Sequence, residues 1–129
     1  MKHIGILAHS FEGAALCYRT MCLEGVKRLG PHRHPEITLT GRGMADVLDD
    51  WERGDLPALR AFFQRDIEKL AADGCDAVAL VCTEIPLLIT QGLSPLPILD
   101  STRLLAAAAV SVATGERPVP EWRGGPVGR

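Results

Sequence analysis

A short, continuous run of apolar residues ends in three side chains that can carry chemistry. Residues 76–84 read Asp-Ala-Val-Ala-Leu-Val-Cys-Thr-Glu. An apolar run of this length is typical of a strand that is buried on both faces, as in a parallel sheet. Groups just beyond the carboxyl end of such a strand lie in the crevice where open α/β sheets bind ligands. Cys82, Thr83 and Glu84 are therefore candidate site residues.

The rest of the chain alternates strand-like and helix-like segments. We expect strands over residues 3–8, 36–40, 76–81 and 95–99, and helices over 13–29, 44–55, 56–73, from 85 onward and from 101 to 114. This alternation predicts the α/β class, as a single Rossmann-like domain whose four-stranded, mainly parallel sheet carries helices on both faces. We expect the domain to occupy residues 1–114 and the Pro- and Gly-rich residues 115–129 to form a flexible tail.

Composition narrows the functional classes. The 129 residues give room for one domain with a sizeable core, and 47% hydrophobic with 23% charged residues is ordinary for a globular protein. A net charge of −2 without a basic stripe argues against nucleic acid as a partner. No apolar run is long enough to cross a membrane, and the N-terminus lacks a signal-type segment, so we expect a cytoplasmic protein. The four cysteines match neither zinc-site nor disulfide spacing, which predicts free thiols.

Cys82 has the setting of a reactive cysteine. The following residues can start a helix, with Pro86 in the first turn, where a missing N–H costs nothing. A helix N-terminus favours a thiolate through its dipole and its free N–H groups. The alternative interpretation is that Cys82 is a small buried hydrophobe at a strand end. We prefer the functional interpretation because of its position.

Two further loops are expected at the same edge of the sheet. His9 and Ser10 follow the first strand, and Arg42 follows the second, so they can meet the Cys82–Glu84 segment over a small anionic ligand. Each also has a structural interpretation, as a loop histidine, a helix N-cap or a surface arginine, and Thr83 and Glu84 can serve as N-cap and first-turn acid.

Neither a metal nor a dinucleotide is indicated. His32 and His34 form a pair without a third ligand at suitable spacing, and we predict no metal site. Gly5 lies inside the first strand and opens no GxGxxG fingerprint, so a dinucleotide site has no support.

Four segments resemble the aspartate/glutamate racemase superfamily. Residues 82–89 (Cys-Thr-Glu-Ile-Pro-Leu-Leu-Ile) and 97–102 (Pro-Ile-Leu-Asp-Ser-Thr) are similar to its second half, and residues 4–7 and 12–19 to its first strand and helix. The resemblance covers about residues 3–113. It implies an enzyme without cofactors that uses two cysteines, one from each of two similar α/β domains, on opposite faces of a substrate's α-carbon. One thiolate removes the α-proton and the other thiol returns a proton.

The sequence departs from that pattern because it joins a family-like beginning to a family-like ending and keeps only the second cysteine, Cys82. By the resemblance, Cys82 is the acid/base, His9 and Ser10 bind a carboxylate or amino group, Thr83 binds a second carboxylate, and Glu84 orients Cys82 or binds an amino group. Arg42 is a candidate grip for a substrate carboxylate.

Three hypotheses follow from this departure. The first is a racemase-like isomerase acting on a small carboxylate-bearing substrate, its site completed by a homodimer that brings two copies of Cys82 together. The second is a one-cysteine decarboxylase or isomerase of the same superfamily. The third is a non-catalytic relative that binds a small acid or a partner protein.

Overall fold

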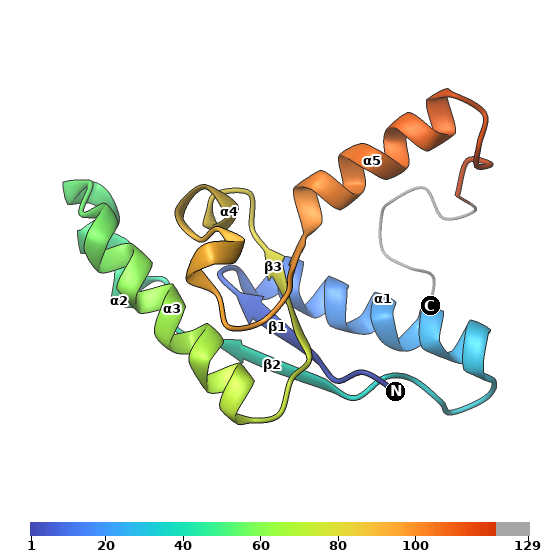
Figure 1. Cartoon of the computed structure of the whole chain (residues 1–129), viewed down its shortest axis with the longest axis horizontal. Helices are drawn as coiled ribbons and strands as arrows, with labels where there is room; N and C mark the ends of the chain where they lie inside the picture. Colours follow the sequence, from blue (N-terminus) through green and yellow to red (C-terminus); the bar gives the residue numbers. More distant parts are fainter. Residues whose placement is uncertain (121–129) are drawn as a thin grey trace.

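A four-stranded sheet forms the centre of the computed structural model, which describes residues 1–120 (Figure 1). The strands are β1 (Ile4–Ala8), β2 (Ile37–Gly41), β3 (Ala77–Val81) and β4 (Ile98–Asp100), in the spatial order β2-β1-β3-β4. All three strand pairings are parallel. The predicted α/β fold is confirmed, and the sheet that we expected to be mainly parallel is wholly parallel.

The carboxyl ends of the three longer strands are in register. Ala8 at the end of β1 lies opposite Gly41 of β2 and Val81 of β3. Gly41 is required by this alignment, since a Cβ atom there would lie 2.8 Å from the Cβ of Ala8. The loops that follow β1, β2 and β3 therefore leave from one edge of the sheet.

Helices cover both faces of the sheet, as expected. Alternate strand residues point to opposite faces. Ile6 and Ala79 face α1 (Phe11–Leu29), and Leu7 and Leu80 face the side that carries α3 (Leu56–Ala72). The short helices α2 (Ala45–Arg53) and α4 (Ile85–Leu88) lie against α3, and the 3-10 helix η1 (Gln91–Leu93) leads into β4.

The core on the α3 side is the larger one. Helix α3 carries apolar side chains at helical spacing toward this core: Leu59, Phe62, Phe63, Ile67 and Leu70 are buried, and Ala71 is partly buried. They pack with apolar side chains from β1, α2, β3, α4 and the residues that precede β4. Most of the apolar area that the described chain removes from water therefore lies on this side.

The opposite side has a small core and a poorly covered helix. The buried apolar cluster there has three members, Ile6, Ala14 and Ala79. Helix α5 (Ser101–Ala113) extends away from the sheet (Figure 1) and contains no buried residue, although its sequence from Leu104 to Val110 is entirely apolar. This apolar helix surface lacks cover from the rest of the described chain.

The predicted ends of the elements hold with small differences. Asp100 caps α5, its carboxylate accepting from the N–H groups of Thr102 and Arg103. Helix α1 begins at Phe11, two residues earlier than predicted, because Gly13 is accommodated within its first turn. The helix expected from Ile85 ends after a single turn at Leu88.

Residues 121–129, which form most of the predicted tail, lie outside the described residues. Within residues 1–120, no helix combines the length and the apolar character needed to cross a membrane.

Candidate active site

The candidate site lies where the strand order of the sheet reverses. From β1 the chain passes to β2 on one side, and from β3 it passes to β4 on the other. In open α/β sheets the crevice at this switch point, beyond the carboxyl ends of the strands, is the usual place for a ligand. His9 follows β1 and Cys82 follows β3, so the segments predicted from the sequence meet at this point.

Cys82 is a half-buried thiol that donates to a carboxylate. Its Sγ lies 2.9 Å from Oε2 of Glu84, and its side chain packs against the larger core. Burial raises the pKa of the Cys82 thiol above its usual value, and the hydrogen bond to Glu84 and the charge of that carboxylate raise it further. Hydrogen bonds from the backbone N–H groups of Glu84 and Ile85 lower the pKa of the thiol, but by less than the other effects raise it.

The expectation that a helix N-terminus makes Cys82 a thiolate is therefore wrong. The N–H donors are present, but α4 has only four residues, so few peptide dipoles are aligned behind them. Desolvation and an adjacent negative charge both favour the protonated form of a thiol. At neutral pH the structure holds Cys82 as a hydrogen-bond donor.

Glu84 complements this thiol as a carboxylate. Hydrogen bonds from Cys82, from Thr83 and from its own backbone N–H lower the pKa of Glu84, and the positive form of His9 favours the carboxylate further. The side chain does not cap α4. Its interpretation as a first-turn helix acid is thus incomplete, since its strongest partner is the thiol two residues before it.

His9 is held by aromatic side chains from the α2–α3 pair. Its imidazole stacks on Trp51 with ring centroids 6.1 Å apart and meets Phe63 edge-on at 5.7 Å. These contacts fix the plane of the ring at the edge of the sheet. His9 is therefore a positioned side chain and not a free loop histidine.

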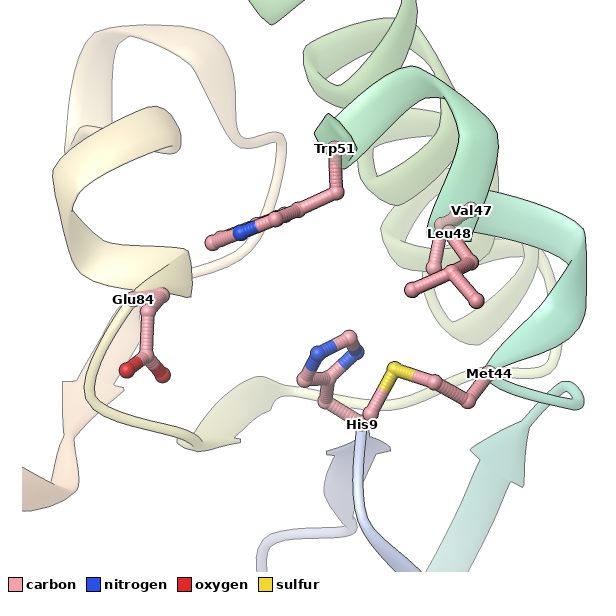
Figure 2. Close-up of a pocket in the computed structure, with 6 residues that line it drawn as sticks. All are labelled: His9, Met44, Val47, Leu48, Trp51 and Glu84. Atoms are coloured by element: carbon pink, nitrogen blue, oxygen red, sulfur yellow. The ribbon is translucent and has the colours of Figure 1, made fainter. Parts of the chain in front are cut away.

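A pocket of about 390 Å³ opens beside these residues. Figure 2 shows His9 at its centre, Glu84 on one side, Met44, Val47 and Leu48 on the other, and Trp51 above the imidazole. Sequence reasoning missed the four residues from the start and body of α2, because the segment was interpreted only as a short acidic helix. Their spacing of i, i+3, i+4 and i+7, the pattern of one helix face, was the signal that could have found them.

Ser10 and Thr83 lie beside this centre. Ser10 occupies the N-cap position of α1 but makes no side-chain capping hydrogen bond, and it is exposed. Thr83 is exposed and interacts with the carboxylate of Glu84. Both hydroxyls are accessible to a ligand at the sheet edge.

Arg42 is engaged elsewhere at the same end of the sheet. Its Nη2 lies 2.5 Å and its Nε 3.1 Å from Oδ1 of Asp66, and the guanidinium lies 4.4 Å from the ring centre of Phe62. Asp66 is the buried charged residue of α3, and Arg42 neutralises it. This ion pair ties the loop between β2 and α2 to α3, and so holds the helix that carries the pocket wall.

None of the other three cysteines lines this pocket. Cys17 and Cys22 belong to α1, and burial raises the pKa of Cys17. Cys75 precedes β3, with its Sγ 3.6 Å from Nε2 of His3. Within residues 1–120 no three His, Cys, Asp or Glu side chains are grouped as a metal ion would need.

Removing the charge of Glu84 should make Cys82 more reactive. In Glu84→Gln the negative charge that raises the pKa of Cys82 is gone, so the thiolate fraction at pH 7.5 should rise and alkylation by iodoacetamide should be about three- to tenfold faster. The rate is measured at Cys82 by peptide mass spectrometry. Glu36→Gln removes the same charge beside the start of β2 and should leave the rate unchanged. Slower or unaltered alkylation in Glu84→Gln would contradict the role assigned to Glu84.

Comparison with known proteins agrees with this geometry. The model of the Asp/Glu/hydantoin racemase family matches residues 2–109. A Yersinia pestis crystal structure assigned to the Asp/Glu racemases superposes with a TM-score of 0.77 at 18% identity, over 90% of this chain and 50% of its own. An aspartate racemase homologue from Pyrococcus horikoshii OT3 gives a TM-score of 0.67 at 15% identity, over 89% of this chain and 50% of its own.

These likenesses differ in what they establish. At such identities the two solved structures show the shared fold, and the chain spans about half the length of each. Comparison with curated protein sequences finds no match. The family match extends over most of the sequence, from β1 into α5, and includes the Cys82–Glu84 segment. The chain therefore belongs to the Asp/Glu/hydantoin racemase family.

Proposed function

We propose that the chain is a cofactor-independent isomerase that moves a proton at the α-carbon of a small carboxylate-bearing substrate through Cys82. One observation carries the proposal: the thiol of Cys82 lies 2.9 Å from a carboxylate at the switch point of the sheet, in a chain that belongs to a racemase family. A thiol that can give up and regain a proton is a suitable general acid/base at an acidic carbon.

The neighbouring groups supply the remaining roles. Glu84 holds the proton of Cys82 in a defined direction, and its charge is balanced when a substrate amino group approaches. The first N–H groups of α1, which Ser10 leaves uncapped, together with the hydroxyls of Ser10 and Thr83, offer donors for carboxylate oxygens. His9, fixed by Trp51 and Phe63, bounds the substrate on the other side. Arg42 acts through Asp66 and the loop before α2, and not as a direct ligand.

Racemisation needs a second acid/base on the opposite face of the carbon. We propose that a second copy of the chain supplies it, with its own Cys82, in a homodimer. The unburied apolar surface of α5 supports such an assembly, since Leu104, Leu105 and Val110 are 56–70% exposed. The matched part of the chain covers half of each solved relative, so the matched parts of two copies would together span about the length of one relative.

A one-thiol reaction is the second candidate, and the protonation state of Cys82 favours it. A single thiol held protonated beside a carboxylate is already prepared to deliver a proton to a carbanion from one face. Decarboxylation of a prochiral diacid would generate such a carbanion without a base on the opposite face. Its product would be a single enantiomer.

Proton exchange in D2O distinguishes the candidates. The protein is incubated with enantiopure α-amino acids and with 2-substituted malonates, and the α-proton signal and the optical purity of the product are followed, with sedimentation velocity on the same samples. We expect loss of the α-proton, a racemic product and a dimer. A monomer that racemises would contradict the dimer site, and optically pure product from malonates would establish the second candidate. A substrate that binds without exchange or decarboxylation would leave a non-catalytic binding role.

A further inference from the structure

The pocket beside His9 and Glu84 indicates which substituent the substrate carries. We infer that this pocket receives a bulky apolar side chain, aryl or branched alkyl, on the reacting carbon of the substrate, and that it rejects a second carboxylate. This inference rests on the proposed function for the position of the reacting carbon next to Cys82. The nature of the pocket wall stands on the structure itself.

One apolar face of α2 forms the wall. Met44, Leu48 and Trp51 are 39–47% exposed although they are large apolar side chains, and Val47 anchors the same face in the larger core at 2% exposure. Exposed apolar side chains that gather around a concave surface gain free energy when an apolar group displaces the water between them. Three such side chains line the pocket and converge on one space (Figure 2).

The charges around the pocket oppose an acidic side chain. Glu84 is the acidic side chain of the wall, the interactions described above favour its carboxylate form, and no lysine or arginine of the described chain belongs to the wall. Helix α2 adds four acidic side chains and a single basic one, Arg53, which pairs with Asp50. Arg42, at the same end of the sheet, is committed to Asp66. A second substrate carboxylate would thus lose water beside like charges, with no lysine or arginine of the described residues in the wall to pair with.

The aromatic groups add a preference for a flat substituent. The Trp51 indole and the His9 imidazole are nearly parallel, with an interplanar angle of 30°, and both border the cavity. Aromatic faces bind other rings by offset stacking or edge-on contact. A volume of about 390 Å³ accommodates a ring together with the atoms that join it to the reacting carbon, and lies in the usual range of small-molecule sites.

Glu84 connects this pocket to the chemistry. The same carboxylate borders the cavity and accepts the hydrogen bond from Cys82. A substrate whose side chain fills the space between Trp51 and Leu48 therefore has its backbone atoms at the Glu84 end of the pocket. The carbon that bears the side chain lies next to the thiol in that orientation.

Ligand binding tests the inference separately from catalysis. The probes are phenylalanine and aspartate, which share the same backbone, and the reporter is Trp51 fluorescence in a Trp122→Phe background that leaves Trp51 as the single tryptophan. We expect phenylalanine to bind at least tenfold more tightly than aspartate. Leu48→Arg should reverse that order, because it introduces the missing cation and fills part of the apolar space. Leu29→Arg is the matched control: Leu29 is 40% exposed against 44% for Leu48, lies at the end of α1, and should leave both affinities unchanged.

Each outcome decides one claim. Equal or tighter binding of aspartate by the unsubstituted pocket would overturn the inference, as would an unaltered preference in Leu48→Arg. If phenylalanine binds with the expected preference but its α-proton does not exchange, the inference holds and the proposed isomerase activity fails. If exchange occurs but is faster with aspartate, the activity holds and the inference fails.

Discussion

Replacing Cys82 with serine is expected to lower the rate of α-proton exchange by about 10²- to 10⁴-fold, the usual contribution of a general acid or base. The serine hydroxyl keeps the size of the side chain and can still donate to Glu84. Its pKa is too high for it to take and return a proton at neutral pH. The measurement is the rate of α-deuterium incorporation by NMR at saturating substrate, with circular dichroism to verify the fold. Cys22→Ser, at a partly buried cysteine of α1, is the matched control and should keep full activity.

Mixing the two proteins separates a two-thiol site from a one-thiol site. If each site needs Cys82 from both copies, a mixed dimer of the unaltered chain and Cys82→Ser is inactive, and an excess of the variant should suppress most of the activity. If one thiol is sufficient, each unaltered subunit keeps its activity and the total should not fall. Full activity in Cys82→Ser alone would contradict both mechanisms.

Replacing Phe63 with alanine should have the largest effect on stability. Phe63 is 1% exposed and lies in the larger core, with its ring 5.4 Å from that of Phe62 and 5.7 Å from that of His9. Removing a buried phenylalanine ring costs about 3–5 kcal/mol of unfolding free energy, because apolar burial is lost and a cavity remains. That is a large share of the roughly 5–15 kcal/mol that stabilises a typical domain. Urea unfolding followed by circular dichroism gives the difference.

A second phenylalanine provides the control for this loss. Phe11 is 80% exposed at the start of α1, so Phe11→Ala should change the unfolding free energy by less than about 0.5 kcal/mol. A loss below about 1 kcal/mol in Phe63→Ala would contradict the packing described for α3. Since Phe63 also supports the ring of His9, the variant should bind substrate more weakly under conditions where it remains folded.

Much of the fold was readable because its signals are local. The run 77–81 is apolar at every position, which predicts a buried strand. The apolar residues of α3 recur with helical spacing, which predicts a helix and the face that it buries. Pro95 and Pro97, which cannot donate to a sheet, fit the start of a strand or an edge strand; both lie just before β4, which is an edge strand. Parallel pairing of the strands was then sufficient to predict that His9 and Cys82 lie at the same edge of the sheet.

The site was less predictable because its character depends on contacts between distant segments. The protonation of Cys82 is decided by burial and by the direction of the Glu84 side chain, neither of which is encoded in the Cys-Thr-Glu spacing. Arg42 was predicted to bind a ligand carboxylate. Its guanidinium instead donates to Asp66, which lies 24 residues later in the sequence. The apolar wall of α2 was visible in the spacing of its residues, yet the acidic side chains between them dominated its composition.

The two faces of the sheet are covered by cores of different size, so the two sides of the domain differ in how easily they deform. The α3 side joins the site to a continuous core, so opening there requires most of the structure to unfold. The buried apolar cluster on the α1 side has three members, and no residue of α5 is buried. Rearrangement of α5 therefore costs far less free energy than any disturbance of the site. The chain thus combines a rigid face, whose core includes the side chain of Cys82, with a more deformable face formed by α1 and α5.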